Sequence, residues 1–201
     1  MSWATPITLV GNNITLIPLS IDHTEGLIKA ASDGELWHIW YADIPSPDTM
    51  QMEINRKIES QKQGKILPFT VVNIDTKQII GMTTYYNIDS KTKRIDIGST
   101  WYSKSHQKTM ANTEAKFLLL NHAFETLKCV AVELRISIFN QESKKAAERL
   151  GAKYMGTLRN HRLLKNGILT DSYIYSIIDS EWPTIKTHLT WKLMNRQINI
   201  K

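Results

Sequence analysis

RIDIGSTWY (residues 94–102) and SKSHQKTMAN (residues 103–112) open the segment that decides the fold of this chain. The first piece is typical of a strand, and the second is a polar loop. A helical pattern follows over residues 113–128, then a strictly alternating strand over residues 130–139. A short helix over residues 140–151 closes the segment. This order predicts a βαβ unit whose loop lies at the carboxyl end of the first strand, where open α/β sheets bind ligands.

The loop over residues 103–112 has the features of an anion site. It carries Lys104 and Lys108 and leads directly into a helix. The first N–H groups of a helix have no partner inside it, and the helix dipole favours negative charge there. The pattern therefore predicts a phosphate-bearing ligand at residues 103–113.

Length and composition indicate one globular domain. The chain has 201 residues, of which 22% are charged, and its formal net charge is +6. A basic chain suits an anionic partner, although a mildly basic balance is also common for solubility alone. The sequence contains no run of five or more like charges, and therefore no basic arm. No strong nucleic-acid signal is present.

The single cysteine and the apolar segments exclude several classes of protein. Cys129 alone makes no disulfide framework, and its apolar neighbours favour a buried thiol over a catalytic one. Neither a signal peptide nor an apolar run of membrane-spanning length is visible. We therefore expect a cytoplasmic protein without membrane contact.

The rest of the chain adds strands and helices on both sides of this segment. Strands are predicted over residues 13–19, 67–74, 78–86, 154–164 and 168–178, and helices over residues 20–31, 46–64 and from residue 182 onward. Within residues 94–102, simple alternation places Ile95, Ile97, Ser99 and Trp101 on one face and Arg94, Asp96, Gly98, Thr100 and Tyr102 on the other. The order of elements predicts one mixed-sheet domain of the α/β or α+β class.

Several motifs together resemble one known family. They are Asp96-Ile97-Gly98 with Trp101, Gln107 through Lys116, Ala123-Phe124-Glu125, Glu133-Leu134-Arg135, Asn140 with Ser143, Ala147 through Ala152, Gly156 through His161, Tyr175-Ser176-Ile177 and Glu181-Trp182-Pro183. In this order they resemble the GNAT N-acetyltransferases, in particular the ribosomal-protein-type (RimJ/RimL-like) branch. The resemblance covers roughly residues 10–190, and residues 191–201 are interpreted as a C-terminal helical extension.

The resemblance implies a fold and a co-substrate. The expected fold is a single GNAT domain with a mixed, mostly antiparallel sheet and a splayed parallel strand pair flanked by helices. Acetyl-CoA would lie between the strands over residues 94–102 and 130–139. The residues implied in its binding are Trp101, Tyr102, Gln107, Lys108, Thr109, Met110, Ala111, Asn112, Thr113, Asn140, Ser143 and Lys144.

The phosphate loop departs from the family pattern Gln/Arg-x-x-Gly-x-Gly/Ala. Gln107 matches, but Met110 and Asn112 stand where the glycines are expected. Glycine allows the backbone to approach a phosphate closely. Because Met110 adds a side chain there, we expect weaker or altered pyrophosphate binding.

Two residues are candidates for acid–base chemistry. Asp96 stands where the family usually has a carboxylate that acts as a base, and Ser143 where a hydroxyl lies near the CoA sulfur. The alternative for Asp96 is an ion pair with Arg94 or another cation. The alternative for Asn140 and Ser143 is plain capping of the helix that they start.

Aromatic residues before the main sheet are candidates for the acceptor site. The resemblance places Trp37, His38, Trp40, Tyr41 and Tyr85 at the substrate, although core packing is an alternative for all of them. The histidines show no metal-ligand spacing, so no metal is expected. Tyr173 and Tyr175 are weaker candidates for an acid, because aromatic residues in strands more often pack.

The predicted function is acetyl-CoA-dependent N-acetyl transfer to a primary amine, either a protein N-terminus or a small molecule, by direct transfer. One alternative is a GNAT-fold module that binds acyl-CoA with little or no transfer. A second is a basic domain that docks on the ribosome or tRNA. Dimers are common in the family, so a homodimer is also expected.

Overall fold

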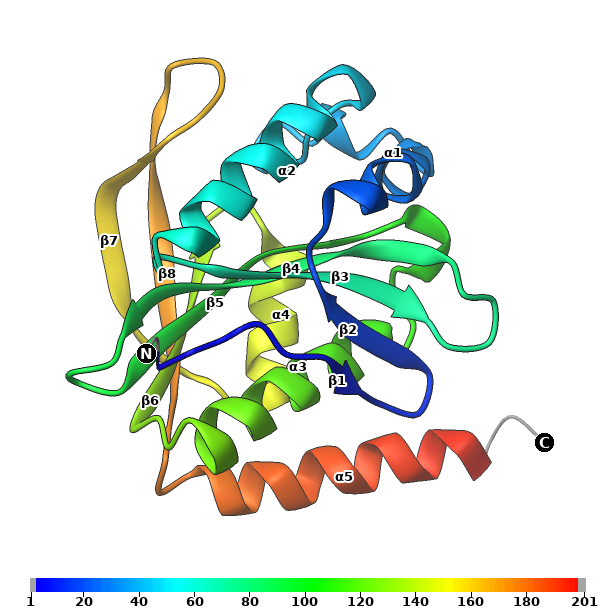
Figure 1. Cartoon of the computed structure of the whole chain (residues 1–201). Helices are drawn as coiled ribbons and strands as arrows, with labels where there is room; N and C mark the ends of the chain where they lie inside the picture. Colours follow the sequence, from blue (N-terminus) through cyan, green and yellow to red (C-terminus); the bar gives the residue numbers. More distant parts are fainter. Residues whose placement is uncertain (1–2, 199–201) are drawn as a thin grey trace.

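An eight-stranded sheet forms the centre of the molecule (Figure 1). The computed structural model describes residues 3–198, and the side chains of residues 3–195. The strands are β1 (Leu9–Val10), β2 (Ile14–Pro18), β3 (Leu67–Asn73), β4 (Ile79–Asp89), β5 (Arg94–Tyr102), β6 (Ala131–Ser137), β7 (Lys153–Leu163) and β8 (Leu169–Ile178). The helices are α1 (Thr24–Ser32), α2 (Pro47–Lys62), α3 (Ala111–Asn121), α4 (Gln141–Leu150) and α5 (Trp182–Ile198).

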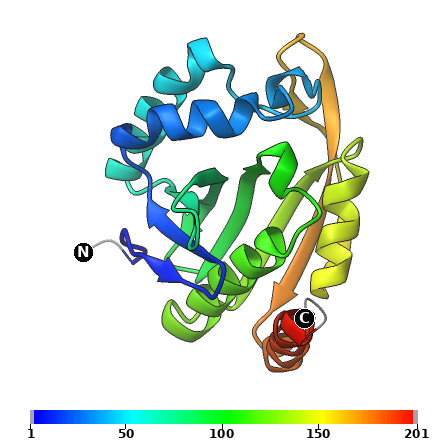
Figure 2. The same cartoon turned by 90° about the vertical axis from the view of Figure 1, so that its right-hand side faces the viewer.

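Helices cover both faces of this sheet (Figure 2). One buried core joins the sheet to α1 and α2 and includes Leu27, Met50 and Met82. The other joins it to α3, α4 and α5 and includes Leu119 and Leu189. The sheet therefore separates two layers of helices, which we call the α2 face and the α3 face.

Helix α2 begins at a reciprocal cap. The Ser46 backbone N–H donates to the Thr49 hydroxyl at 3.0 Å, and Pro47 supplies a first residue with a preset φ. Its buried positions are Met50, Ile54 and Lys57, which lie on one face at helical spacing. The buried stripe of α2 thus ends on a lysine.

The strand order is β1-β2-β3-β4-β5-β6-β8-β7, and β5 and β6 are the parallel pair of the sheet in residues 3–198. They are paired only at Arg94 with Ala131, Ile95 with Val132 and Asp96 with Glu133. Both strands then continue without pairing to each other, β5 to Tyr102 and β6 to Ser137. The predicted splayed parallel pair is confirmed, and it opens after Asp96.

A β-bulge lies in β5 just beyond this point. Gly98 pairs with Thr84 and Trp101 pairs with Met82, so two residues of β5, Ser99 and Thr100, lie opposite one residue of β4. Ser99 has a φ of 44°, in the left-handed region that serine rarely adopts. The extra residue shifts the alternation of the strand by one.

The bulge makes the predicted faces of β5 wrong in its second half. Ile95 and Ile97 lie in the core of the α3 face, as alternation predicts, but Trp101 lies in the core of the α2 face. Tyr102 lies in the α3-face core with the two isoleucines. One inserted residue moves every following side chain to the opposite face.

Most predicted elements are confirmed, with small differences at their ends. The helix predicted over residues 113–128 is α3, which ends at Asn121 and continues as a π-helical turn over His122–Thr126. Helix α5 runs without a break across residues 190 and 191, and the rest of the predicted extension, residues 199–201, lies outside the described residues. The division of the chain at residue 191 stays a prediction. In residues 3–198, no helix has both the length and the apolar character needed to span a membrane.

Candidate active site

The predicted phosphate loop connects β5 to α3 and is braced by its own side chains. Gln107 Nε2 donates to the Tyr102 carbonyl at 3.0 Å, which ties the loop back to the end of β5. Thr109 Oγ1 donates to the His106 carbonyl at 2.8 Å and accepts the Ala111 N–H at 3.2 Å. The loop is therefore ordered before any ligand arrives.

Met110 is the residue before the first turn of α3, and its backbone is ordinary. Its φ is −74° and its ψ is −12°, which any residue adopts, so this position does not need the freedom of glycine. Lys108 is the loop residue with a positive φ, 60°. Any effect of Met110 on a phosphate must therefore come from its half-buried side chain. Asn112 and Thr113, also predicted to bind the co-substrate, lie half-buried in the same first turn of α3.

Trp101 and Tyr102 are both buried at the end of β5, each 6% exposed. Trp101 packs in the α2-face core, so its side chain lies on the face opposite to that of Tyr102. The Tyr102 hydroxyl is buried and has no hydrogen-bond partner in residues 3–195. Buried polar groups are rarely left unpaired. The Tyr102 hydroxyl is thus a polar group of the α3-face core whose position, at the end of β5, no contact in residues 3–195 explains.

Asn140 lies where β6 gives way to α4, on the other side of the opening. Its Oδ1 accepts the Ser143 N–H at 3.0 Å, so the capping alternative is confirmed for Asn140. Ser143 is half-buried in the first turn of α4. Lys144 Nζ lies 5.8 Å from the centre of the Tyr173 ring and 3.9 Å from Glu148 Oε1. The cap uses the Asn140 side-chain oxygen and the Ser143 backbone, not the Asn140 amide nitrogen or the Ser143 hydroxyl.

Asp96 is already engaged with two neighbours. Its Oδ2 accepts a hydrogen bond from Asn87 Nδ2 at 2.6 Å and forms an ion pair with Arg135 Nε at 2.9 Å. Burial raises the pKa of this carboxyl above its usual value, against the lowering effects of the Asn87 hydrogen bond and the Arg135 charge. The ion-pair alternative is thus present with Arg135 as the cation. The role of Asp96 as a base stays a prediction.

The predicted acceptor residues divide into exposed and buried ones. Trp40 is 51% exposed, with its ring 4.7 Å from that of Phe139 and 5.6 Å from that of Tyr41. His38 is exposed, whereas Trp37 packs partly against the α2-face core. Tyr85 is fully buried and its hydroxyl donates to the Leu119 carbonyl at 2.5 Å. The packing alternative is thus what the structure shows for Tyr85, which lies in the α3-face core, and its substrate role stays a prediction.

A cavity of about 320 Å³ lies beside Trp40. It is lined by Trp40, Ile138, Phe139, Leu164, Ile168, Leu169, Thr170 and Asp171. The Thr170 hydroxyl is buried and has no hydrogen-bond partner in residues 3–195. The cavity is thus largely apolar with one unpaired hydroxyl, and it adjoins Asn140 through Phe139.

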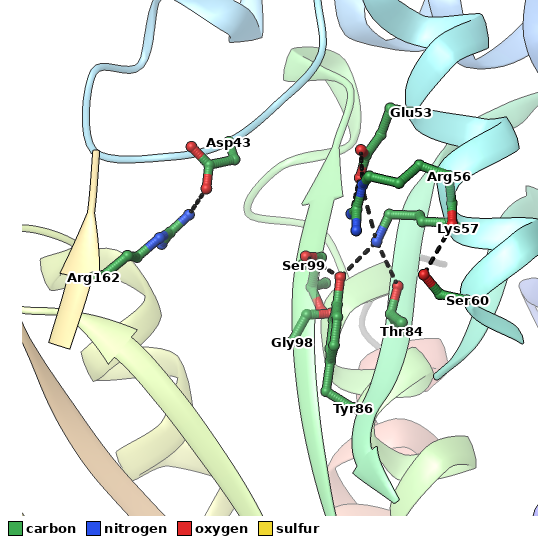
Figure 3. Close-up of polar contacts among 11 residues, drawn as sticks. Asp43, Glu53, Arg56, Lys57, Ser60, Thr84, Tyr86, Gly98, Ser99 and Arg162 are labelled. Carbon is green, nitrogen blue, oxygen red and sulfur yellow. Dashed lines mark hydrogen bonds and ion pairs between the residues drawn. The ribbon is translucent and has the colours of Figure 1, made fainter. Parts of the chain in front are cut away.

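A polar cluster on the α2 face was not predicted from the sequence (Figure 3). Lys57 Nζ lies 2.6 Å from the Tyr86 hydroxyl, and that hydroxyl lies 2.7 Å from Ser99 Oγ in the bulge. Across the opening in this view, an ion pair of Asp43 and Arg162 links the loop before α2 to β7. The one sign of this cluster in the sequence is Lys57, which continues the helical stripe of Met50 and Ile54.

Metal binding has no candidate in the part of the chain that the structure describes. No group of three or more histidine, cysteine, aspartate or glutamate side chains in that part is placed to hold an ion. Cys129 is buried, and burial raises its pKa to about 12. This thiol is therefore protonated and poorly reactive at neutral pH.

A family assignment follows from comparison with known proteins. Residues 13–153 match the model of the acetyltransferase (GNAT) domain. The chain belongs to the GNAT acetyltransferase family. The fold predicted from the resemblance is confirmed by a GCN5-related N-acetyltransferase from Brucella melitensis, with a TM-score of 0.82 and 28% identity over 93% of this chain and 85% of that one.

Two other likenesses are to proteins named for ribosomal substrates. A Bacillus subtilis relative called "putative ribosomal N-acetyltransferase YdaF" is 30% identical over 104 residues, which is 52% of this chain and 56% of the relative. RimL, a ribosomal L7/L12 α-N-protein acetyltransferase solved with coenzyme A, shares the fold with a TM-score of 0.73 and 18% identity over 86% of this chain and 99% of RimL. The prediction of the GNAT family is confirmed, and these two likenesses are to proteins whose names belong to the ribosomal-protein-type branch. The alternative of a module without transferase activity has no support among these likenesses.

Proposed function

We propose that this GNAT acetyltransferase transfers the acetyl group of acetyl-CoA directly to a primary amine at the opening between β5 and β6. The observation that carries the proposal is the parallel pair that separates after Asp96 and Glu133, beside the start of α3. Such a gap exposes backbone groups of two strands to a ligand. RimL, which shares this fold, is a protein with coenzyme A bound.

The residues around the opening fit acetyl-CoA. The N–H groups in the first turn of α3, of which that of Ala111 is already bonded to Thr109, suit its pyrophosphate. The buried Tyr102 hydroxyl at the end of β5 and the Asn140 amide between β6 and α4 are further polar groups near the two strands that separate. The loop over residues 107–112 would hold the diphosphate, and residues 140–144 the thiol arm. Bound there, acetyl-CoA supplies an acyl group activated as a thioester.

The acceptor would approach from the α2 face. The cavity beside Trp40 opens next to Phe139 and Asn140. Its apolar lining and the Trp40–Phe139 ring pair suit a flat or apolar group. The unpaired Thr170 hydroxyl suits one polar atom on that group. We therefore expect an amine that carries an apolar or aromatic group.

Direct transfer requires no covalent enzyme intermediate. The amine nitrogen attacks the thioester carbon, the C–S bond breaks and the sulfur receives the electron pair. The sulfur then needs a proton, for which the Ser143 hydroxyl is the proposed donor, and the amine must lose one. Cys129 is unsuited as an acyl carrier, because burial keeps its thiol protonated.

A thiol-release assay tests the proposal. Purified protein is supplied with acetyl-CoA and a panel of N-terminal peptides, polyamines, amino sugars and aminoacyl nucleotides, and acetyl-CoA binding is measured by calorimetry. We expect binding and turnover of at least one amine, with the highest kcat/KM for acceptors that carry an aromatic or large aliphatic group. Absence of both binding and turnover would overturn the proposal, and binding without turnover would instead favour a module without transferase activity.

A further inference from the structure

A lysine occupies a core position of α2. Lys57 is 2% exposed and follows Met50 and Ile54 in the buried stripe of the helix. An apolar side chain would fill that position without the large cost of removing an ammonium group from water. The contacts of the Lys57 amino group must therefore explain why a lysine occupies this position.

The main contact of Lys57 is the hydroxyl of Tyr86 on β4. The Lys57 Nζ to Tyr86 oxygen distance is 2.6 Å, and Nζ also lies 3.3 Å from Thr84 Oγ1 and 3.7 Å from Glu53 Oε1. An ammonium group only donates hydrogen bonds, so Lys57 donates to the tyrosine oxygen. The Ser99 hydroxyl lies 2.7 Å from the same oxygen. Without its own proton, the Tyr86 oxygen can accept from both Lys57 and Ser99, which favours its negatively charged form.

The cluster lies where β5 has left β6. Ser99 is the exposed bulge residue, three positions after the last pair of the two strands at Asp96. Tyr86 lies opposite Asp96 in the β4–β5 ladder and is only partly buried. Its hydroxyl therefore reaches the separated part of β5 on the α2 face, the face from which the acceptor is proposed to enter (Figure 3).

We infer that Tyr86 is the catalytic residue that takes the proton of the acceptor amine, and that Lys57 is the positioning residue that favours its phenolate. This inference rests on the proposed transfer to an amine. As the C–N bond forms and the C–S bond breaks, the amine proton passes to the Tyr86 oxygen. CoA leaves as the thiolate or, after protonation, as the thiol. Tyr86 then releases its proton to water.

The electrostatic surroundings agree with this role. Burial raises the pKa of Tyr86, but the charge and hydrogen bond of Lys57 and the bond from Ser99 bring it below its usual value. The charged groups that face Tyr86 are Glu53, Arg56 and Lys57 from α2 and Asp96 from β5. Glu53 and Asp96 each have an arginine partner, Arg56 and Arg135 respectively. The Tyr86 oxygen thus faces the cations of α2, Lys57 and Arg56, while the two carboxylates are engaged with arginines.

The test compares Tyr86→Phe, Lys57→Met and the control Tyr154→Phe, a tyrosine of β7 that is 54% exposed and is bonded to Thr157. With an accepted amine, we expect Tyr86→Phe to lower kcat about 100-fold and the control to stay within twofold of the native enzyme. In Lys57→Met, the limb of kcat/KM that rises with pH should move to higher pH, because the phenolate loses its cation. The pKa of the free amine cannot explain such a shift, since the substitution leaves it unchanged.

A second measurement follows the tyrosines themselves and needs no acceptor. Titration of tyrosinate absorbance in the folded protein should show one tyrosine that ionises at lower pH than the others and is absent in Tyr86→Phe. Native kcat in Tyr86→Phe, or no early-ionising tyrosine in the native protein, would overturn the inference. If the native enzyme acetylates no amine at all, the proposed function fails, while the titration still decides whether Lys57 lowers the pKa of Tyr86.

Discussion

Two buried lysines reach the bulge of β5 from opposite faces of the sheet. Lys57 on α2 bonds to Tyr86, next to Ser99, and has the carboxylate of Glu53 3.7 Å away. Lys116 on α3 donates to Thr100 Oγ1 at 2.7 Å and has no carboxylate within 4.0 Å in residues 3–195. Burial lowers the pKa of Lys116 to about 7.

The comparison shows that two similarly buried lysines differ in their ionic surroundings. Burial without a carboxylate partner disfavours the charged form of Lys116, whereas Lys57 has Glu53 3.7 Å away. The α2 face therefore places a lysine–glutamate pair beside Tyr86. The α3 face, where the co-substrate is proposed to lie, has an amine whose pKa burial lowers to about 7.

Stability should respond most to loss of the paired lysine. Lys57→Met leaves Glu53 and Tyr86 without their buried cation, and we expect a loss of about 3 kcal/mol in the free energy of unfolding. Urea denaturation measures it. The matched control is Lys62→Met, an exposed lysine of the same helix 3.5 Å from Glu59, which should change stability by less than about 0.5 kcal/mol. A loss as small as that of the control would show that the contacts of Lys57 with Glu53 and Tyr86 do not stabilise the fold.

Loss of Lys116, the lysine without a carboxylate partner in residues 3–195, should change stability in the opposite direction. The folded-state pKa of Lys116, about 7, lies below its usual value, so the unfolded chain binds more protons between these values and stability rises with pH in that window. Lys116→Met removes this cost and should stabilise the protein at pH 7, with an advantage that falls by about 2 kcal/mol between pH 7 and pH 9 and disappears only near the usual lysine pKa of about 10.4. Urea denaturation at both pH values measures it. An equal effect at both, or destabilisation at pH 7, contradicts the assignment.

The acceptor side can be separated from the co-substrate side by kinetics. Trp40→Ala should raise the KM of the amine about tenfold, because it removes one wall of the apolar cavity, while the KM of acetyl-CoA stays within twofold. Trp191→Ala on α5, 62% exposed, is the matched control and should change neither constant. Equal changes in both KM values for Trp40→Ala would mean that the two ligands do not enter from separate faces.

The smallest effect is expected in the phosphate loop. Met110→Gly should lower the Kd of acetyl-CoA about threefold, because the loop loses a side chain next to the proposed diphosphate. Met110→Ala should give the same gain, since the backbone of residue 110 is already in an ordinary conformation. Calorimetry measures both. An unchanged or weaker affinity in Met110→Gly would show that the methionine is no obstacle.

Sequence patterns predicted the fold and the co-substrate side well, for identifiable reasons. The alternation of residues 130–139, the polar loop before α3 and the Asn140 cap are local signals, and each has the predicted local structure. The bulge gave no such signal, because one serine with a positive φ leaves the composition of the strand unchanged. The faces on which Trp101 and Tyr102 lie were therefore predicted wrongly.

The acid–base cluster escaped prediction because it depends on tertiary contacts. Lys57, Tyr86 and Ser99 come from α2, β4 and β5, and no spacing along the chain relates them. A lysine within an apolar stripe was the one local sign. Tyr85 was chosen instead of Tyr86, and these neighbours point to opposite faces of β4, one to the core and one to the opening.

The central claim is that acetyl-CoA and the amine occupy the opening of β5 and β6 together. Initial velocities with both substrates varied test it most directly, combined with the intact mass of the protein incubated with acetyl-CoA alone. We predict intersecting double-reciprocal lines and an unmodified protein mass. Parallel lines together with an acetylated protein would show that the acetyl group passes through the enzyme, and would contradict direct transfer.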